Sequence, residues 1–231
     1  MARTGFFHHI GTFLLFAATV LLIVTCISAP VVHDLALMKI ELGGNNAGSD
    51  ANVALGTFGW CDNNINSHGD DVCSKSQVGY SISSIPALSF IHLSSAAEDT
   101  TRGLTKAMIL HPIACGLNFI AFLLALGAGL VGSFLASAVA LLAFLVTLVI
   151  MIIDFVMFAI VRSNINDSGT NATAQYGAAA WTILVSAICS LLGTLVVFFT
   201  CCSGRMHKNR QVVPAKTDYG VAPATRRRRW F

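Results

Sequence analysis

Residues 104–162 form a nearly uncharged stretch that constrains the fold of the chain more than any other feature. Lys106, Asp154 and Arg162 are the only Lys, Arg, Asp or Glu residues in it. Crossing a bilayer core takes about 20 apolar residues in a helix, so this stretch is long enough to cross twice. A glycine-rich run at residues 127–132 interrupts it without adding charge, which predicts a helical hairpin with a short turn.

The composition extends this interpretation to the whole chain. Of the 231 residues, 55% are hydrophobic and 11% are charged, and the mean hydropathy is +0.72. That leaves too little polar surface to cover a soluble globule. Two further apolar runs, residues 10–29 and 177–200, raise the expected spans to four, and Trp181 lies where an interfacial anchor belongs. We therefore expect an all-α membrane protein with a four-helix transmembrane bundle.

The first apolar run has an alternative interpretation as a cleaved signal peptide. Arg3 precedes it, and Cys26-Ile27-Ser28 places small residues where cleavage occurs. Its length suits a span better than the roughly 7–15 apolar residues of a signal peptide.

Basic residues predict the orientation. Residues 201–231 carry eight Lys or Arg against Asp218 alone, and such clusters stay on the cytoplasmic side. With four crossings, both termini are expected inside. The expected layout is a cytoplasmic N-terminus at 1–9, spans at 10–29, 106–127, 133–161 and 177–200, an extracellular domain at 30–105, a cytoplasmic turn at 128–132, a second extracellular loop at 162–176 and a cytoplasmic tail at 201–231.

The first outer loop is polar and mildly acidic, and we expect it to fold into a small β-rich domain. Residues 31–42 and 51–60 are β-compatible and flank a turn rich in Gly and Asn. A third strand is expected from Cys73 to Tyr80, and a short helix at residues 86–97.

This loop holds two of the seven cysteines, Cys61 and Cys73. In an oxidising exterior they imply one disulfide, which would stabilise the domain by about 3 kcal/mol. The alternatives are two free thiols or a metal site shared with His68, although that site would be one ligand short of a structural zinc centre.

The same loop resembles the claudin-type signature, in which a glycine, an aromatic residue and two cysteines lie in the first loop of a four-span protein. Here Gly56, Gly59 and Trp60 precede Cys61, and Cys73 follows. The resemblance implies a claudin-like tetraspan fold.

More narrowly, ILHPIACGLNFIAFLLALG (109–127) and IIDFVMFAI (152–160), with Arg102 and Leu104, resemble the fungal SUR-seven/PalI family. Within it, the chain is most similar to the PalI-type regulators of the ambient-pH response, over residues 10–200. Some PalI proteins carry a long cytoplasmic tail, whereas this chain extends about thirty residues past its last span, as expected of a short-tailed branch.

Two ionisable residues lie at membrane depth in the hairpin. Asp154 is about six residues from the outer end of its span and His111 about five, so both are expected roughly 7–9 Å below the outer boundary. Because such groups are costly in a bilayer and find partners in the bundle, we expect Asp154 to accept a hydrogen bond from His111. Pro112 has no N–H, which leaves a carbonyl one turn earlier open. The pair is either a proton-sensitive latch or a structural clasp worth about 1 kcal/mol or less.

Four residues are candidates for covalent modification. Asn166 and Asn171 begin N-x-[ST] patterns in the second outer loop, which predicts glycosylation. Cys201 and Cys202 follow the last span, where thiols are often palmitoylated; two reduced thiols are the alternative.

The C-terminal end carries a basic patch suited to an anionic inner leaflet. A solvated tail or a retention address is the alternative. Its members are Arg226, Arg227, Arg228 and Arg229.

No G-x-S-x-G, Walker-loop or H-E-x-x-H pattern occurs in the sequence, so we expect no enzyme, cofactor or metal. A nucleic-acid role is not expected either, because the basic patch is tethered to a bilayer. Small residues in the spans are expected to allow close contact with a partner. They are Gly116, Ala121, Ala125, Gly127 and Gly193.

The resemblance implies an accessory protein of the fungal pH response at the plasma membrane. Its expected partners are membrane lipids, a seven-span pH sensor of the PalH type and an arrestin-like adaptor, and a homo-oligomer is also open. The alternative is a structural tetraspan scaffold of plasma-membrane domains, either eisosome-associated or claudin-like. A pore or transporter is disfavoured, because His111 and Asp154 lie near one face and do not line a path.

Overall fold

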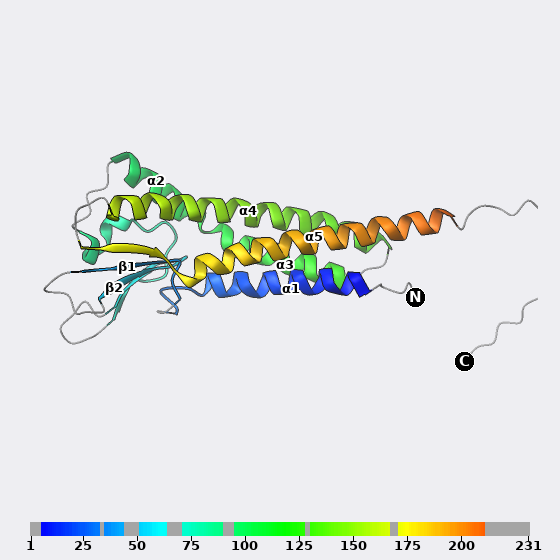
Figure 1. The fold of residues 1–231 in the computed structure, drawn as a ribbon, viewed down its shortest axis with the longest axis horizontal. Helices are drawn as coiled ribbons and strands as arrows, with labels where there is room; N and C mark the ends of the chain where they lie inside the picture. The colour runs from blue at the N-terminus through cyan, green and yellow to red at the C-terminus, as the bar shows by residue number, and fades with distance from the viewer. Residues whose placement is uncertain are drawn as a thin grey trace, which may run out of the picture.

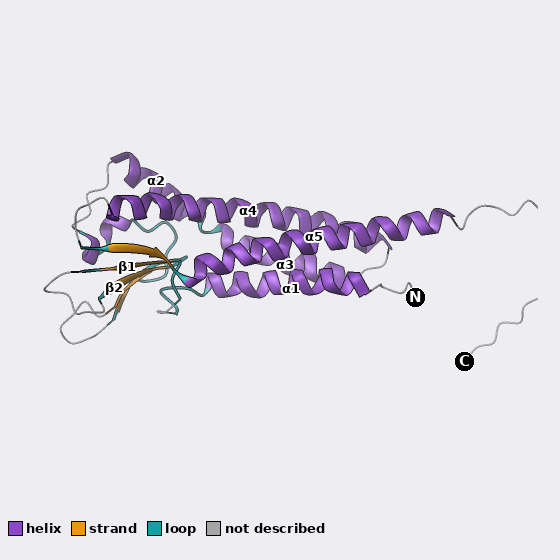
Figure 2. Cartoon of the chain, in the orientation of Figure 1, coloured by secondary structure: helices purple, strands orange, loops and turns teal. Residues whose placement is uncertain are grey.

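The structure, a computed structural model, describes residues 6–32, 35–43, 51–63, 71–89, 95–127, 130–166 and 171–210. Four long helices lie side by side, and a β-sheet lies at one end of this bundle, while α1 begins and α5 ends at the other (Figure 1). Figure 2 shows the sheet as the strand-rich part of an otherwise helical chain. Within the described residues, four helices are long and apolar enough to cross a membrane. The expected fold class is confirmed.

The bundle helices form a ring in which α1 and α4 each pack against both α3 and α5. They are α1 (Phe6–Cys26), α3 (Leu110–Leu126), α4 (Leu130–Asn166) and α5 (Ala178–Arg210). Small side chains fill much of the ring's interior, which lets the helix backbones approach closely. They include Ala18, Ala114, Ala121, Ala140, Ala143, Ser186 and Ser190.

Large apolar side chains cover the outward faces of the bundle. On α3 the exposed row runs from Ile109, just before the helix, to Leu126, and on α4 it runs from Phe134 to Val156. At 1.5 Å per residue these rows are about 26 and 33 Å long, close to the roughly 30 Å core of a bilayer. On α5 the row begins at Trp181, which is 55% exposed.

Three of the small residues expected to contact a partner lie inside the bundle instead. Ala121 and Ala125 are buried between helices. A Cβ on Gly193 would lie 3.2 Å from the carbonyl oxygen of Gly11, where α5 crosses α1. These three residues pack against other helices of the bundle, whereas Gly116 and Gly127 are exposed on its outside.

The end of the molecule that the sequence analysis expects outside the cell, here called the outer domain, is built on a five-stranded antiparallel sheet with the order β4-β3-β2-β1-β5. The strands are β1 (Met38–Glu41), β2 (Asn52–Leu55), β3 (Trp60–Asn63), β4 (Val72–Cys73) and β5 (Thr173–Tyr176). The last strand comes from the second outer loop, so both outer loops contribute to one sheet.

The expected strand bounds are wrong in part. The described part of residues 31–42 contains β1 alone, because the chain first turns after α1 and the Ala29 N–H bonds to Leu35 O. Residues 51–60 contain β2 and the start of β3 rather than one strand. The segment after Cys73 leaves the sheet and turns at Gly79, whose φ is 76°.

One face of the sheet covers a hydrophobic core that α4 also lines. With 37 residues, α4 is about 55 Å long, longer than the roughly 30 Å core of a bilayer, and its last turns support the sheet. The sheet contributes Met38, Ile40, Val53 and Leu55 to this core, and α4 contributes Met157, Phe158, Val161 and Ile165.

The segment before α3 completes the outer domain. Two 3₁₀ turns, η1 (Ile82–Ser84) and η2 (Pro86–Leu88), bring Ile82 and Leu88 into the core. The helix expected at residues 86–97 is wrong, since α2 spans Ser95–Ala107. Glu98 in its first turn favours a helix that begins there.

Candidate functional site

The structure brings His111 and Asp154 together. His111 Nε2 lies 3.1 Å from Asp154 Oδ2, and the two side chains are 0% and 1% exposed. Each residue lies two positions inward from the last lipid-facing apolar residue on its side, Ile109 and Val156. The pair therefore lies near the end of these apolar rows, next to the outer domain.

Pro112 leaves the Met108 carbonyl open for a second contact of His111. A residue with an N–H at that position would bond to Met108 O in a regular helix, and proline cannot. The carbonyl is taken instead by His111, whose backbone N lies 3.1 Å from it and whose Nδ1 lies 3.0 Å from it. The missing N–H of Pro112 therefore separates α2 from α3. The imidazole ring of His111 is held between the Met108 carbonyl and the Asp154 carboxyl group.

These two contacts specify how many protons the pair needs. A carbonyl oxygen only accepts, so Nδ1 must carry a proton to bond to Met108 O. The contact between Nε2 and Oδ2 needs another proton, carried by either the imidazole or the carboxyl group of Asp154. Both hydrogen bonds exist together only while His111 and Asp154 share this second proton.

The second carboxyl oxygen, Asp154 Oδ1, is buried and has no hydrogen-bond partner in the described part of the chain. Tyr80 is buried near the pair: burial raises the pKa of its hydroxyl, and nearby Asp154 raises it further. The Tyr80 hydroxyl donates to Gly56 O at 2.9 Å, and Thr105 Oγ1 donates to Tyr80 O at 2.9 Å. The site is therefore linked to the sheet and to α2.

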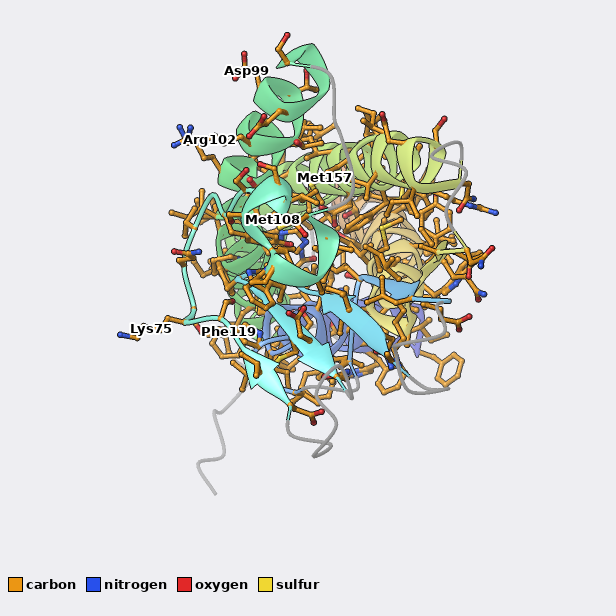
Figure 3. The ribbon with its side chains drawn as sticks, turned by 90° about the vertical axis from the view of Figure 1, so that its left-hand side faces the viewer. Lys75, Asp99, Arg102, Met108, Phe119 and Met157 are labelled. Carbon is orange, nitrogen blue, oxygen red and sulfur yellow. A yellow bond between two sulfur atoms is a disulfide. The ribbon has the colours of Figure 1, made fainter. Side chains whose placement is uncertain are left out.

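Figure 3 views the molecule from the outer-domain end, and its labels locate this region. Met108 and Met157 lie near the middle of the view, whereas Asp99 and Arg102 lie on the projecting helix α2. Both methionines are buried in the outer-domain core. Because Met108 O also binds His111, the core and the pair share a residue.

The signature residues Gly56 and Gly59 attach the sheet to the end of α1. A Cβ on Gly56 would overlap the backbone of Ala29, and one on Gly59 would overlap Ser74 Oγ. Between them, Thr57 Oγ1 donates to Thr25 O at 2.9 Å, which satisfies a carbonyl at the end of α1. Only glycine permits this close approach.

Trp60 and Cys61 lie on β3, and Cys73 lies on β4. Trp60 is half-buried beside the outer-domain core. Cys61 and Cys73 are partners in the register of β3 and β4 and form a disulfide with an S–S distance of 2.03 Å. His68, the third member of the alternative metal site, lies outside the described residues.

The predicted modification sites are described in part. Asn166 is the last residue of α4, and its Oδ1 accepts a hydrogen bond from the Ala174 N–H at 3.3 Å. Asn171 is exposed just before β5. Cys201 and Cys202 lie in α5, where their side chains are not described.

The basic patch falls in the part of the chain that the structure does not describe. This applies to Arg226, Arg227, Arg228 and Arg229.

Two further layers of polar contacts between the bundle helices were not predicted from the sequence. Asn118 Nδ2 donates to Thr147 Oγ1 at 3.3 Å in the middle of the bundle. At the other end, His8 Nε2 lies 2.9 Å from Ala125 O. The spacing of residues 111, 118 and 125 is a heptad on α3, which could have signalled that all three face the interior.

Comparison with known proteins gives one match. The model of the SUR7/PalI family matches residues 7–193 of the chain. A search of curated proteins finds no match. The matched range includes all four bundle helices, at least in part, the sheet and the His111–Asp154 pair.

Proposed function

Because the chain belongs to the SUR7/PalI family, we propose that it is a PalI-type accessory protein of a fungal ambient-pH signalling pathway. SUR7/PalI proteins are non-enzymatic membrane proteins, and the chain has the four apolar helices of a multi-pass protein. Its role would be to help a seven-span pH sensor of the PalH type reach or assemble at the plasma membrane, upstream of an arrestin-like adaptor. Both termini would be cytoplasmic.

The observation that carries this proposal is the buried contact between His111 Nε2 and Asp154 Oδ2, which are 3.1 Å apart. Breaking this contact leaves buried polar groups unpaired, which is costly. The contact joins α3 to α4 beneath the outer domain. If the contact is a proton-sensitive latch, a change in the protonation of the imidazole with outside pH would weaken the junction between the sheet and the bundle.

The experiment compares His111→Gln with Asn118→Leu in cells that carry the sensor. Both variants break a polar contact between bundle helices, but only the first removes an imidazole. With equal amounts of both variants at the surface, a latch predicts that His111→Gln changes the pH at which signalling begins and that Asn118→Leu does not. An unchanged pH profile in His111→Gln contradicts the latch.

The second candidate function is a structural tetraspan scaffold of plasma-membrane domains. It is favoured by the Asn118 and His8 layers, which tie helices together as the His111–Asp154 pair does but contain no carboxylate. Deleting the chain separates the two functions. Failure to grow at alkaline pH with loss of the sensor from the surface supports the accessory role, whereas normal alkaline growth with disordered membrane patches supports the scaffold.

A further inference from the structure

A row of four polar residues crosses the sheet at its outer end, on the face opposite the core that α4 lines. Asn63 on β3 is opposite Asn52 on β2, which is opposite Glu41 on β1, which is opposite Thr173 on β5. Directly opposed residues share one face of a sheet, and the neighbouring row carries the core residues on the other face. Asn63 Nδ2 donates to Asn52 Oδ1 at 3.1 Å.

A cavity of about 460 Å³ lies against this row. It is lined by Glu41, Leu42, Gly43, Ala51, Asn52, Asn171 and Thr173. The row supplies a carboxylate, an amide and a hydroxyl group, and Asn171 adds a second amide. Cavities of a few hundred cubic ångströms accommodate small organic ligands, and this lining offers donors and acceptors rather than an apolar surface.

Two members of the lining belong to a glycosylation sequon. Asn171 is exposed and Thr173 lies two residues further along. Gly43 closes against the backbone of Asn171, since a Cβ on Gly43 would lie 2.5 Å from Asn171 O. The acceptor side chain is thus held at the edge of a polar cavity large enough for a sugar.

We propose that Asn171 carries an N-linked glycan whose first N-acetylglucosamine lies in this cavity. In the modification, Asn171 Nδ2 bonds to the anomeric carbon of the sugar. The bond from that carbon to the diphosphate of a lipid-linked oligosaccharide donor breaks, and the proton from Nδ2 leaves with the diphosphate. The sugar hydroxyl and acetamido groups then bond to Glu41 and Asn52.

The second sequon lies outside this cavity. Asn166 does not line it, and its Oδ1 accepts the Ala174 N–H at the free edge of β5. Among the described residues, no comparable polar cavity lies beside Asn166 to bind a sugar attached there. The inference therefore distinguishes two sites that the sequence pattern treats alike.

The first experiment maps the glycan on the full chain, expressed in a eukaryotic host and analysed by electrophoresis before and after endoglycosidase treatment. Asn171→Gln and Thr173→Ala should abolish the mobility shift due to the Asn171 glycan, whereas Thr173→Ser, which keeps the sequon, should retain it. Asn166→Gln should also retain it. Absence of a glycan on Asn171 overturns the inference.

The second experiment tests whether the first sugar lies in the cavity. It measures the rate at which endoglycosidase releases the glycan from the folded protein in membranes. Glu41→Ala should increase that rate several-fold, because the sugar loses a partner in the cavity. Asp99→Ala, which removes an exposed carboxylate on α2, is the matched control and should leave it unchanged. Equal rates for Glu41→Ala and the wild type, with equal release after denaturation, would show that the sugar does not lie in the cavity.

Discussion

Ser190 Oγ donates a hydrogen bond to Asn118 Oδ1 at 3.0 Å in the middle of the bundle. The amide nitrogen of Asn118 donates to Ala114 O at 3.0 Å and to Thr147 Oγ1 at 3.3 Å. One buried amide therefore ties α3 to both α4 and α5. A fully bonded amide in this position fixes how the helices are rotated against each other, since a rotation would leave it without partners.

Replacing Asn118 by leucine should lower the free energy of unfolding by about 1–2 kcal/mol, because it removes hydrogen bonds to two other helices. Thermal unfolding of the purified protein in detergent measures this. Asn164→Ala is the control, since Asn164 Nδ2 donates to Ile160 O within its own helix. Equal losses in the two variants would mean that the Asn118 contacts between helices contribute nothing specific.

Gly56→Ala should destabilise the outer domain by about 1–3 kcal/mol, because the added Cβ would overlap Ala29 and force the sheet away from α1. Gly103→Ala is the matched control: Gly103 lies on α2 with nothing within 4 Å of its Cβ position, so alanine should stabilise the helix by about 0.5–1 kcal/mol. Melting temperatures of the two variants should move in opposite directions. A Gly56→Ala protein as stable as wild type would refute the close contact.

Asp62 should make the stability of the outer domain depend on pH. It lies on the core face of β3 opposite Val53, and burial raises its pKa from 3.8 to about 6. The folded chain therefore keeps this proton at a pH where the unfolded chain has lost it. The contribution of Asp62 to the free energy of unfolding is highest below about pH 4, falls as the pH rises towards 6, and stays at the lower value above that.

The Asp62→Asn variant isolates this contribution. Its melting temperature should decline less than that of the wild type between pH 4 and 6, because an amide does not titrate. Melting curves collected at several pH values in one buffer series provide the measurement. If the two proteins show parallel pH profiles, Asp62 is not buried in the folded outer domain as described.

The sequence predicts the parts of this molecule that follow from local rules. The four spans follow from apolar length, and the disulfide follows from two cysteines in one outer loop. The contact between His111 and Asp154 follows from matched depth and from the cost of an isolated ionisable group in a bilayer. Each of these inferences needs one residue pair or one uninterrupted segment.

What the sequence does not predict depends on contacts between distant segments. β5 has only four residues, and it becomes a strand because β1 offers it an edge. Gly193 indicates close packing, but only the crossing with Gly11 shows that its partner is α1.

A double-mutant cycle on His111 and Asp154 tests the central claim most directly. His111→Ala, Asp154→Ala and the double variant are purified in detergent, and their free energies of unfolding are measured under one set of conditions. The account predicts a coupling free energy of about 1–3 kcal/mol, because the residues share one buried hydrogen bond. Single-variant losses that add to within about 0.5 kcal/mol in the double variant would contradict it.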